Sequence, residues 1–293
     1  MNDNFAVFIL SHGRPDKVIT YNNLIRSGYT GAVYIIIDNE DNTAHQYQKN
    51  YGDIVITFDK AAIAETFDEG DNFGDRRAVV YARNACFDIA RQLGITYFMQ
   101  LDDDYTGFFY QMNSKFESTH SRTIFDIDMI ISYLLNYYQS IPAKSIAIAQ
   151  GGDFLGGLEN DIDKSLNRRR KCMNTFICST DRPFQFVGRI NEDVNTYTWY
   201  QSLGNLFLTF PLLSIRQKQT QANSGGMTEL YLDSGTYIKS FYTVMYSPSS
   251  VTIRTMGELY SRLHHHIKWD NTVPCIIGEK YRKNESAYLE LAE

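Results

Sequence analysis

Short, continuous apolar runs alternate with amphipathic stretches over the first hundred residues. The apolar runs are FAVFIL (5–10), AVYIIID (32–38), DIVITF (53–58) and ITYFMQL (95–101). Such runs are typical of strands that are buried on both faces of a parallel sheet. Between them, residues 15–27 and 75–93 have helical spacing; Pro15 opens the first helix and Gly28 closes it. This alternation predicts an α/β fold with helices on both faces of the sheet.

The second half of the chain is less regular. Helices are predicted over 125–139 and 192–204, and strands at 145–150, CMNTFICS (172–179), FQFV (184–187) and NLFLTF (205–210). The glycine-bearing loops 151–157 and 219–227 are candidate lids on the acceptor side. We expect one catalytic domain over 1–250, with a nucleotide-sugar-binding half at 1–112, an acceptor half at 113–250, and a C-terminal extension at 251–293 that completes the site.

Composition excludes several classes of protein. The 293 residues are 43% apolar and carry a formal net charge of -6, which argues against a protein that coats nucleic acid non-specifically. Four cysteines without a CxxC pair form neither a disulfide framework nor a zinc ribbon and favour a reducing cytoplasm. Neither a secretory leader nor a membrane span is expected from the hydrophobic pattern.

Three consecutive aspartates, Asp102, Asp103 and Asp104, follow the apolar run 95–101. Ligands of parallel α/β sheets bind beyond the carboxyl ends of the strands. On an extended backbone, Asp102 and Asp104 would point to one side and Asp103 to the other. Two carboxylates on one side suit Mg²⁺ or Mn²⁺, and a bound cation would explain why the like charges are tolerated. An acidic surface turn is the alternative interpretation.

The segment AVVYARNACFDIARQLGITYFMQLDDDY (78–105) contains an Arg-Asn pair in an amphipathic helix, followed by an apolar strand that ends in Asp-x-Asp. This order resembles the GT-A glycosyltransferases, whose Asp-x-Asp binds a divalent metal that holds a nucleotide-sugar diphosphate. With SHGRPDKVITYNNLIRSGYTGAVYIIIDNED (11–41), it resembles more specifically the TET/JBP-associated glycosyltransferases. That group is found largely in phages and is proposed to glycosylate hydroxymethylated pyrimidines in DNA.

The resemblance covers about residues 5–115. It implies a GT-A-like Rossmannoid mixed sheet flanked by helices, with an elaborated C-terminal acceptor-side half. It makes Asp104 the main ligand of Mn²⁺ or Mg²⁺, while Asp102 contacts the metal through water or the ribose of a UDP-sugar. The polar residues implied for the donor pocket are Ser11, His12, Arg14, Asp38, Arg83, Asp102 and Asp103. A structural salt bridge is the alternative for Arg83, and a loop cap for Asp38.

Glu192 and Asp193 open the helical stretch 192–204. Inverting GT-A enzymes often take their base from such a Glu-Asp pair, so the resemblance makes Asp193 the candidate catalytic base, with Glu192 beside it. A deprotonated carboxylate can accept the proton of the attacking hydroxyl. The alternative is that the helix dipole alone favours acids at this position.

RLHHHIKW (262–269) contains half of the six histidines. On a strand, His264 and His266 share a face. By resemblance to GT-A enzymes, His264 or His266 completes the metal site; an exposed polar strand is the alternative. The dense basic run Arg168, Arg169, Arg170 and Lys171 is a candidate docking site for a DNA phosphate backbone, with a solvated loop as the alternative.

These features predict an enzyme that moves a hexose, most simply glucose from UDP-glucose, onto a hydroxyl. The family resemblance implies that this hydroxyl belongs to a 5-hydroxymethyl-pyrimidine in phage DNA, in the host cytoplasm. Cytosine and uracil derivatives both remain open as acceptors. One alternative is a GT-A enzyme that acts on polysaccharide, lipid or protein. Another is a sugar-nucleotide pyrophosphorylase, although SHGRPDK contains a single glycine where such enzymes have a glycine-rich loop. The third is a non-catalytic module in which the acids only cap a turn.

Overall fold

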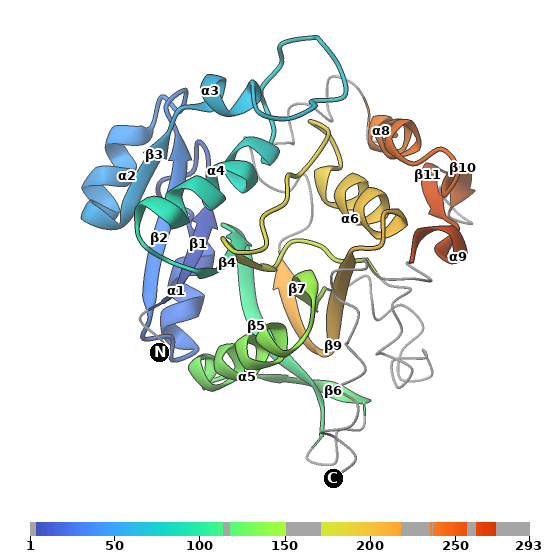
Figure 1. Cartoon of the computed structure of the whole chain (residues 1–293). Helices are drawn as coiled ribbons and strands as arrows, with labels where there is room; N and C mark the ends of the chain where they lie inside the picture. Colours follow the sequence, from blue (N-terminus) through green and yellow to red (C-terminus); the bar gives the residue numbers. More distant parts are fainter. Residues whose placement is uncertain are drawn as a thin grey trace, which may run out of the picture.

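The computed structural model describes residues 4–113, 118–150, 171–217, 235, 237–256 and 262–273. Within these ranges the chain forms a nine-stranded mixed sheet in the order β3-β2-β1-β4-β8-β7-β9-β5-β6, flanked by helices (Figure 1). Its strands are β1 Phe5–Leu10, β2 Ala32–Asp38, β3 Val55–Phe58, β4 Tyr97–Asp102, β5 Tyr105–Met112, β6 Ser118–Thr123, β7 Ala143–Ala149, β8 Phe176–Ser179 and β9 Leu206–Gln217.

The first four strands in chain order make a parallel block. β1 lies between β2 and β4, and β2 pairs with β3, all in parallel register. The remaining strands join this block through antiparallel pairing of β8 with β4, so both halves of the chain share one sheet. The predicted mixed α/β sheet with flanking helices is therefore confirmed.

Alternate residues of β1 enter two separate hydrophobic cores. Phe5, Val7 and Ile9 pack on the side of α1 (Ile19–Arg26) and α5 (Ile127–Ser140). Ala6, Phe8 and Leu10 pack on the opposite side, with α4 (Val80–Gln92) and α6 (Glu192–Ser202). A strand buried on both faces needs apolar residues at every position, which is why the continuous run at 5–10 is a strand.

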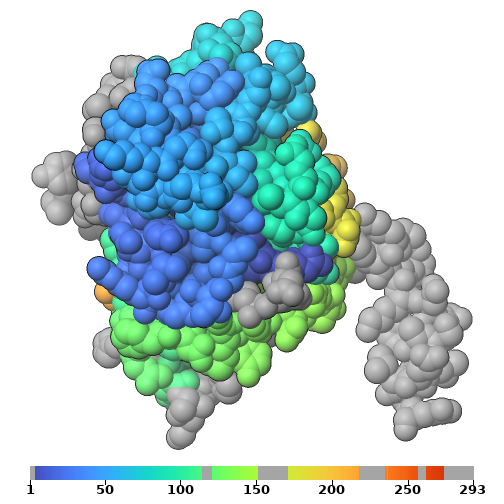
Figure 2. All heavy atoms as spheres, turned by 90° about the vertical axis from the view of Figure 1, so that its left-hand side faces the viewer, coloured from blue at the N-terminus to red at the C-terminus, as the bar shows by residue number. Residues whose placement is uncertain are grey.

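The remaining described elements are helices and a separate two-stranded sheet. The helices are α2 Ala44–Tyr51, α3 Lys60–Ala64, α8 Ile238–Tyr246 and α9 Trp269–Thr272, with a 3-10 turn at Gly52–Ile54. β10 (Val251–Met256) and β11 (Arg262–Ile267) form a separate antiparallel pair that packs beside α8. Figure 2 shows the face of the molecule that is built mainly from the first hundred residues, drawn in blue to green. None of the described helices has the length and apolar character that crossing a membrane requires.

Several predicted boundaries differ from the structure. The helix predicted over 15–27 begins only at Ile19, because Pro15 lies in a turn in which the Lys17 amide donates to the Arg14 carbonyl. The helix predicted from residue 75 begins at Val80. FQFV (184–187) is not a strand, although its phenylalanines are buried in the core beside α4. The 151–157 and 219–227 loops lie outside the described residues.

Gly28 illustrates a position where the fold requires glycine. Its φ is +84°, and a Cβ atom there would lie 2.7 Å from the backbone oxygen of Phe125. We expect Gly28→Ala to lower the free energy of unfolding by about 2–3 kcal/mol, from left-handed strain plus the clash. Gly94→Ala is the matched control, because φ is +68° but no atom lies within 4 Å of the added Cβ. Denaturant unfolding that shows equal losses for the two variants would contradict the proposed clash.

Candidate active site

The predicted site residues of the first half lie at one edge of the parallel block. β1 pairs with β4 so that Leu10 lies opposite Asp102, and β2 ends at Asp38. Because the carboxyl ends of parallel strands meet at the same edge, the loop after Leu10, Asp38 and the aspartate run come together there.

The aspartates occupy a turn rather than an extended strand. β4 ends at Asp102, and Asp103 and Asp104 form the turn into β5. Asp103 points into the protein, where its carboxylate accepts hydrogen bonds from Ser11 Oγ at 2.5 Å and Arg14 Nη1 at 3.1 Å. Burial raises the pKa of Asp103, and these two partners oppose that shift. Asp103 therefore fixes the loop that follows β1, and its contact with a nucleotide stays a prediction.

The charged form of Asp104 is disfavoured in this turn. Burial, and then the charges of Asp102 and Asp103, raise its pKa to about 7. Within the described residues, no group of three or more His, Cys, Asp or Glu side chains forms a metal-binding cluster. Mg²⁺ nevertheless typically takes one or two carboxylates and completes its shell with water and substrate phosphates. The partly exposed carboxylates Asp102 and Asp104 fit that mode of binding.

Arg83 joins the aspartate turn to the second half of the chain. The residue is 1% exposed. Its Nη2 donates to Asp102 Oδ1 at 2.9 Å, and its Nε donates to Glu192 Oε1 at 2.8 Å. The guanidinium also lies over the rings of Phe176 and Phe186. Of the two interpretations of Arg83, the structure contains the salt bridge, and any direct contact with a donor stays a prediction.

Asp193 is the neighbouring acid at the start of α6. Its side chain is buried, and burial followed by the charge of Glu192 raises its pKa to about 7, against the opposing effect of Arg83. Arg83 holds Glu192 in a salt bridge, while the raised pKa of Asp193 lies near neutrality. A carboxylate with such a pKa can accept and release a proton at physiological pH.

His12 and Asp38 form a second charged group. His12 Nδ1 lies 2.7 Å from Asp38 Oδ2, and the hydrogen bond to Asp38 raises the pKa of His12. Lys60, which is also buried, lies 3.3 Å from the other oxygen of Asp38. Asp38 therefore contacts both His12 and Lys60, and the side chain of His12 stays 42% exposed at the rim of a pocket.

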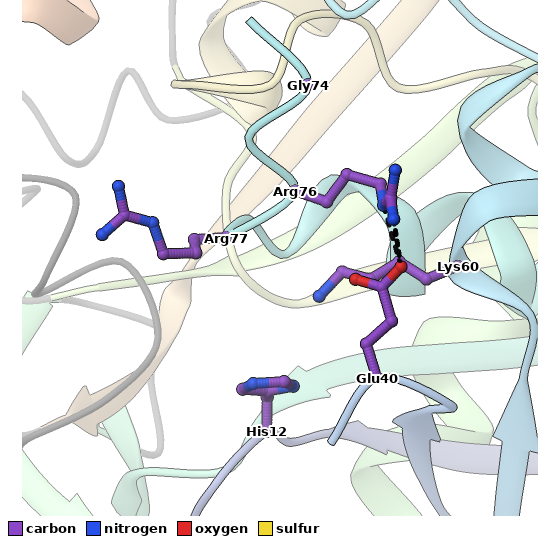
Figure 3. Close-up of a pocket in the computed structure, with 6 residues that line it drawn as sticks. All are labelled: His12, Glu40, Lys60, Gly74, Arg76 and Arg77. Carbon is purple, nitrogen blue, oxygen red and sulfur yellow. Dashed lines mark hydrogen bonds and ion pairs between the residues drawn. The ribbon is translucent and has the colours of Figure 1, made fainter. Parts of the chain in front are cut away.

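That pocket has a volume of about 220 Å³ (Figure 3). Its lining consists of His12, Glu40, Lys60, Gly74, Arg76 and Arg77. These residues come from the loops after β1 and β2, from the first residue of α3, and from the segment before α4. Arg76 forms an ion pair with Glu40. Four of the six lining residues are basic or protonatable, so the pocket suits an anionic or carbonyl-rich ligand.

The predicted histidines lie on β11, outside the central sheet. His264 pairs with Arg254 and His266 with Thr252 across the β10–β11 ladder. The rings of His264 and His265 are in contact, with centroids 4.2 Å apart. Burial, and then Lys239, lower the pKa of His264 to about 4, which keeps it in the neutral form that binds metals. Coordination by His264 or His266 stays a prediction.

Most of the basic run at residues 168–171 lies outside the described residues. Arg168, Arg169 and Arg170 lie beyond the described residues, and Lys171 is the first residue described after the gap. The run as a docking site for DNA therefore stays a prediction.

Sequence reasoning missed several residues of the site. Tyr47 anchors the loop after β1, because its hydroxyl oxygen lies 2.7 Å from Ser11 Oγ and accepts a hydrogen bond from the Arg14 amide. Lys60 follows the third parallel strand, so the rule of strand carboxyl ends could have identified it. Arg76 and Arg77 stand before α4, but nothing in their spacing distinguishes them from solvated arginines.

Comparison with known proteins identifies the family. The model of the TET-associated glycosyltransferases matches residues 5–226. A search of curated proteins finds no match. Among solved structures, glucosyl-3-phosphoglycerate synthase from Mycobacterium tuberculosis, in complex with Mn²⁺, UDP and phosphoglyceric acid, aligns at 10% identity and a TM-score of 0.46, over 91% of this chain and 87% of that one. A structure titled as a mycobacterial protein aligns at 11% identity and the same TM-score, over 91% and 84% of the two chains. Because the family model spans more than half of its residues, the chain belongs to the TET-associated glycosyltransferases.

Proposed function

We propose that this glycosyltransferase moves glucose from UDP-glucose onto the hydroxyl of a 5-hydroxymethyl-pyrimidine in DNA, with the help of a divalent metal. The observation that carries the proposal is the buried ion bridge Asp102–Arg83–Glu192. It joins Asp102 of the candidate metal-binding turn to Glu192, the neighbour of the candidate base Asp193 at the start of α6. A transferase that displaces a diphosphate needs these two functions next to each other.

On the donor side, the pocket in Figure 3 is the proposed nucleotide site. His12 would donate a hydrogen bond to the nucleotide, and Asp38 holds its ring at 2.7 Å. Arg14 would add charge towards the diphosphate from the loop that Asp103 and Tyr47 fix. Guanidinium groups match phosphate geometry, so Arg14, Arg76 and Arg77 suit this role.

Asp104 and Asp102 would hold Mn²⁺ or Mg²⁺, with His264 or His266 as a further candidate ligand. When bound, the cation would supply Lewis-acid stabilisation of the departing diphosphate. The chain itself holds these carboxylates in place. Arg83 orients Asp102 through a hydrogen bond, and the buried side chain of Asp103 fixes the turn. The raised pKa of Asp104 is consistent with a site that a cation completes.

Asp193 is the proposed base, with Glu192 as its buried neighbour. Its carboxylate would take the proton of the acceptor hydroxyl while the hydroxyl oxygen forms a bond to the anomeric carbon. The bond from that carbon to the diphosphate breaks at the same time, and UDP leaves with the electron pair. Such a displacement inverts the anomeric centre, which is the outcome that we propose.

The acceptor is proposed from the family to which the chain belongs. The burial of the proposed base, Asp193, also limits how a DNA acceptor can reach it. A pyrimidine within a duplex must leave the stack to reach a buried carboxylate, so we expect flipping or a single-stranded substrate. Arg168, Arg169, Arg170 and Lys171 would contact the phosphate backbone. We expect the enzyme to act in the cytoplasm, where phage DNA is accessible.

Incubation with labelled UDP-glucose and Mn²⁺ tests the proposal. We expect label on oligonucleotides that contain 5-hydroxymethylcytosine or 5-hydroxymethyluracil, and none on the matched unmodified DNA. Transfer to polysaccharide or protein instead of the modified DNA would reject the acceptor. UDP-galactose run in parallel identifies the sugar, because preference for it would reject glucose.

A further inference from the structure

The segment between α3 and α4 carries part of the nucleotide pocket and is attached to the second half of the chain. Gly74, Arg76 and Arg77 of this segment line the pocket. Just before them, the carbonyls of Asp68 and Glu69 accept hydrogen bonds from the amides of Gly188 and Arg189, at 2.8 and 2.7 Å. The segment is therefore bonded through its backbone to the loop that leads into α6.

A buried arginine strengthens this attachment. Arg189 is 2% exposed. Its Nε and Nη2 donate to Asp71 Oδ2 at 3.0 and 2.8 Å, and the Tyr242 hydroxyl from α8 donates to the same oxygen. Burial alone would raise the pKa of Asp71, but the hydrogen bonds from Tyr242 and Arg189 outweigh it and the pKa is lowered. Asp71 is thus a fixed anion held from two elements of the second half.

The Arg189 guanidinium is also linked to a pocket residue through the carboxylate of Asp75. Arg189 Nη1 lies 3.4 Å from Asp75 Oδ2, and the same Asp75 oxygen lies 2.9 Å from Arg77 Nη2. Arg77 is a pocket residue (Figure 3). An unbroken series of charged contacts therefore runs from Tyr242 and Asp71 through Arg189 and Asp75 to the edge of the pocket. We call Asp71, Asp75, Arg189 and Tyr242 the arginine clamp.

We propose that Arg189 is a positioning residue for the nucleotide pocket, acting through Asp75 and Asp71 to fix the segment that presents Arg76 and Arg77 to the donor. This inference rests on the proposed function, because it takes the pocket as the UDP site. Arg189 also stands three residues before Glu192, so the loop that carries it leads directly into α6. The clamp makes the donor pocket dependent on residues far along the chain.

The geometry assigns the clamp a role beyond general stability. Each of its side chains either belongs to the segment at 68–77 or touches it, and that segment forms one wall of the pocket. Arg182 offers a contrast. Its two Nη atoms donate to the carbonyls of Ile141 and Tyr138, at the end of α5 and outside the pocket.

Calorimetry with UDP and Mn²⁺ distinguishes a role in positioning the pocket from a role in general stability. The variants are Arg189→Met, Arg189→Lys and Tyr242→Phe, and Arg182→Met is the matched control. We expect Arg189→Met to weaken UDP binding about tenfold and to raise the KM for the donor, with kcat at saturating donor changed much less. Arg189→Lys keeps the charge but loses the forked contact, so its affinity should be intermediate. Arg182→Met should lower the melting temperature but bind UDP like the wild type.

Hydrogen exchange over residues 68–77 is the second readout, and it needs no ligand. Faster exchange in Arg189→Met than in Arg182→Met supports the clamp, and equal exchange overturns it. Wild-type affinity for UDP in Arg189→Met also overturns it. If the wild type itself binds no UDP, the proposed function fails, and the exchange comparison alone decides whether Arg189 positions the segment.

Discussion

Replacing Asp104 with asparagine is expected to lower kcat/KM by about 10³-fold, because a cation that neutralises a departing diphosphate supplies several kcal/mol. Asp104 lies in the turn after β4, where burial and two neighbouring aspartates raise its pKa to about 7. A Mn²⁺ ion bound here would offset the repulsion between Asp104 and its two neighbouring carboxylates. The rate should be measured over a range of Mn²⁺ concentrations.

The same variant separates metal binding from folding. Asparagine removes like-charge repulsion from the turn, so Asp104→Asn should not destabilise the metal-free protein. Mn²⁺ should raise the melting temperature of the wild type but not that of the variant, because ligands stabilise the state they bind. Asp88→Asn, at an exposed ion pair with Arg91 on α4, is the matched control and should behave as the wild type. Undiminished turnover in Asp104→Asn, with an intact response to Mn²⁺, would remove the metal site from the mechanism.

The strands of the first half could be predicted from sequence because each is specified by its own run of apolar residues. Phe5–Leu10 and Ala32–Asp38 have the predicted bounds, since β-branched and aromatic runs flanked by polar turns have few alternatives. The start of α1 was wrong because Pro15 suits a turn as well as a first helical position. FQFV was wrong because buried aromatics need a core but no strand, and its backbone at 184–187 forms no ladder.

The sequence could predict which residues lie at the candidate site, but not which side chains they contact. Asp102, Asp38 and His12 follow strand ends, so the topology of a parallel sheet brings them together. The bond between Arg83 and Glu192 spans 109 positions, and nothing in either neighbourhood specifies it. Arg189 was missed for the same reason, since a buried cation is recognised only when its carboxylates are in place.

Replacing Asp193 with asparagine is expected to lower kcat by about 10²–10⁴-fold, the contribution of a positioned base, with little change in the KM for UDP-glucose. An amide keeps the shape of the carboxylate but cannot accept the acceptor's proton. In the wild type, activity should rise as the pH increases through about 7, because Asp193 must lose its proton to act and its pKa is about 7. The acid limb of kcat/KM against pH measures this ionisation in the free enzyme.

Stability should change in the opposite direction to activity. The pKa of Asp193 is higher in the folded chain than in the unfolded one, so its contribution to stability is present at low pH and is lost as the pH rises through about 7. Asp193→Asn should therefore melt at a higher temperature than the wild type above neutral pH, while being nearly inactive. Glu192→Gln tests the electrostatic cause, since removal of the neighbouring charge should move the acid limb to lower pH. An acid limb that stays in place in Glu192→Gln would contradict the contribution of the Glu192 charge to the pKa of Asp193. Full turnover in Asp193→Asn would assign the base to another residue.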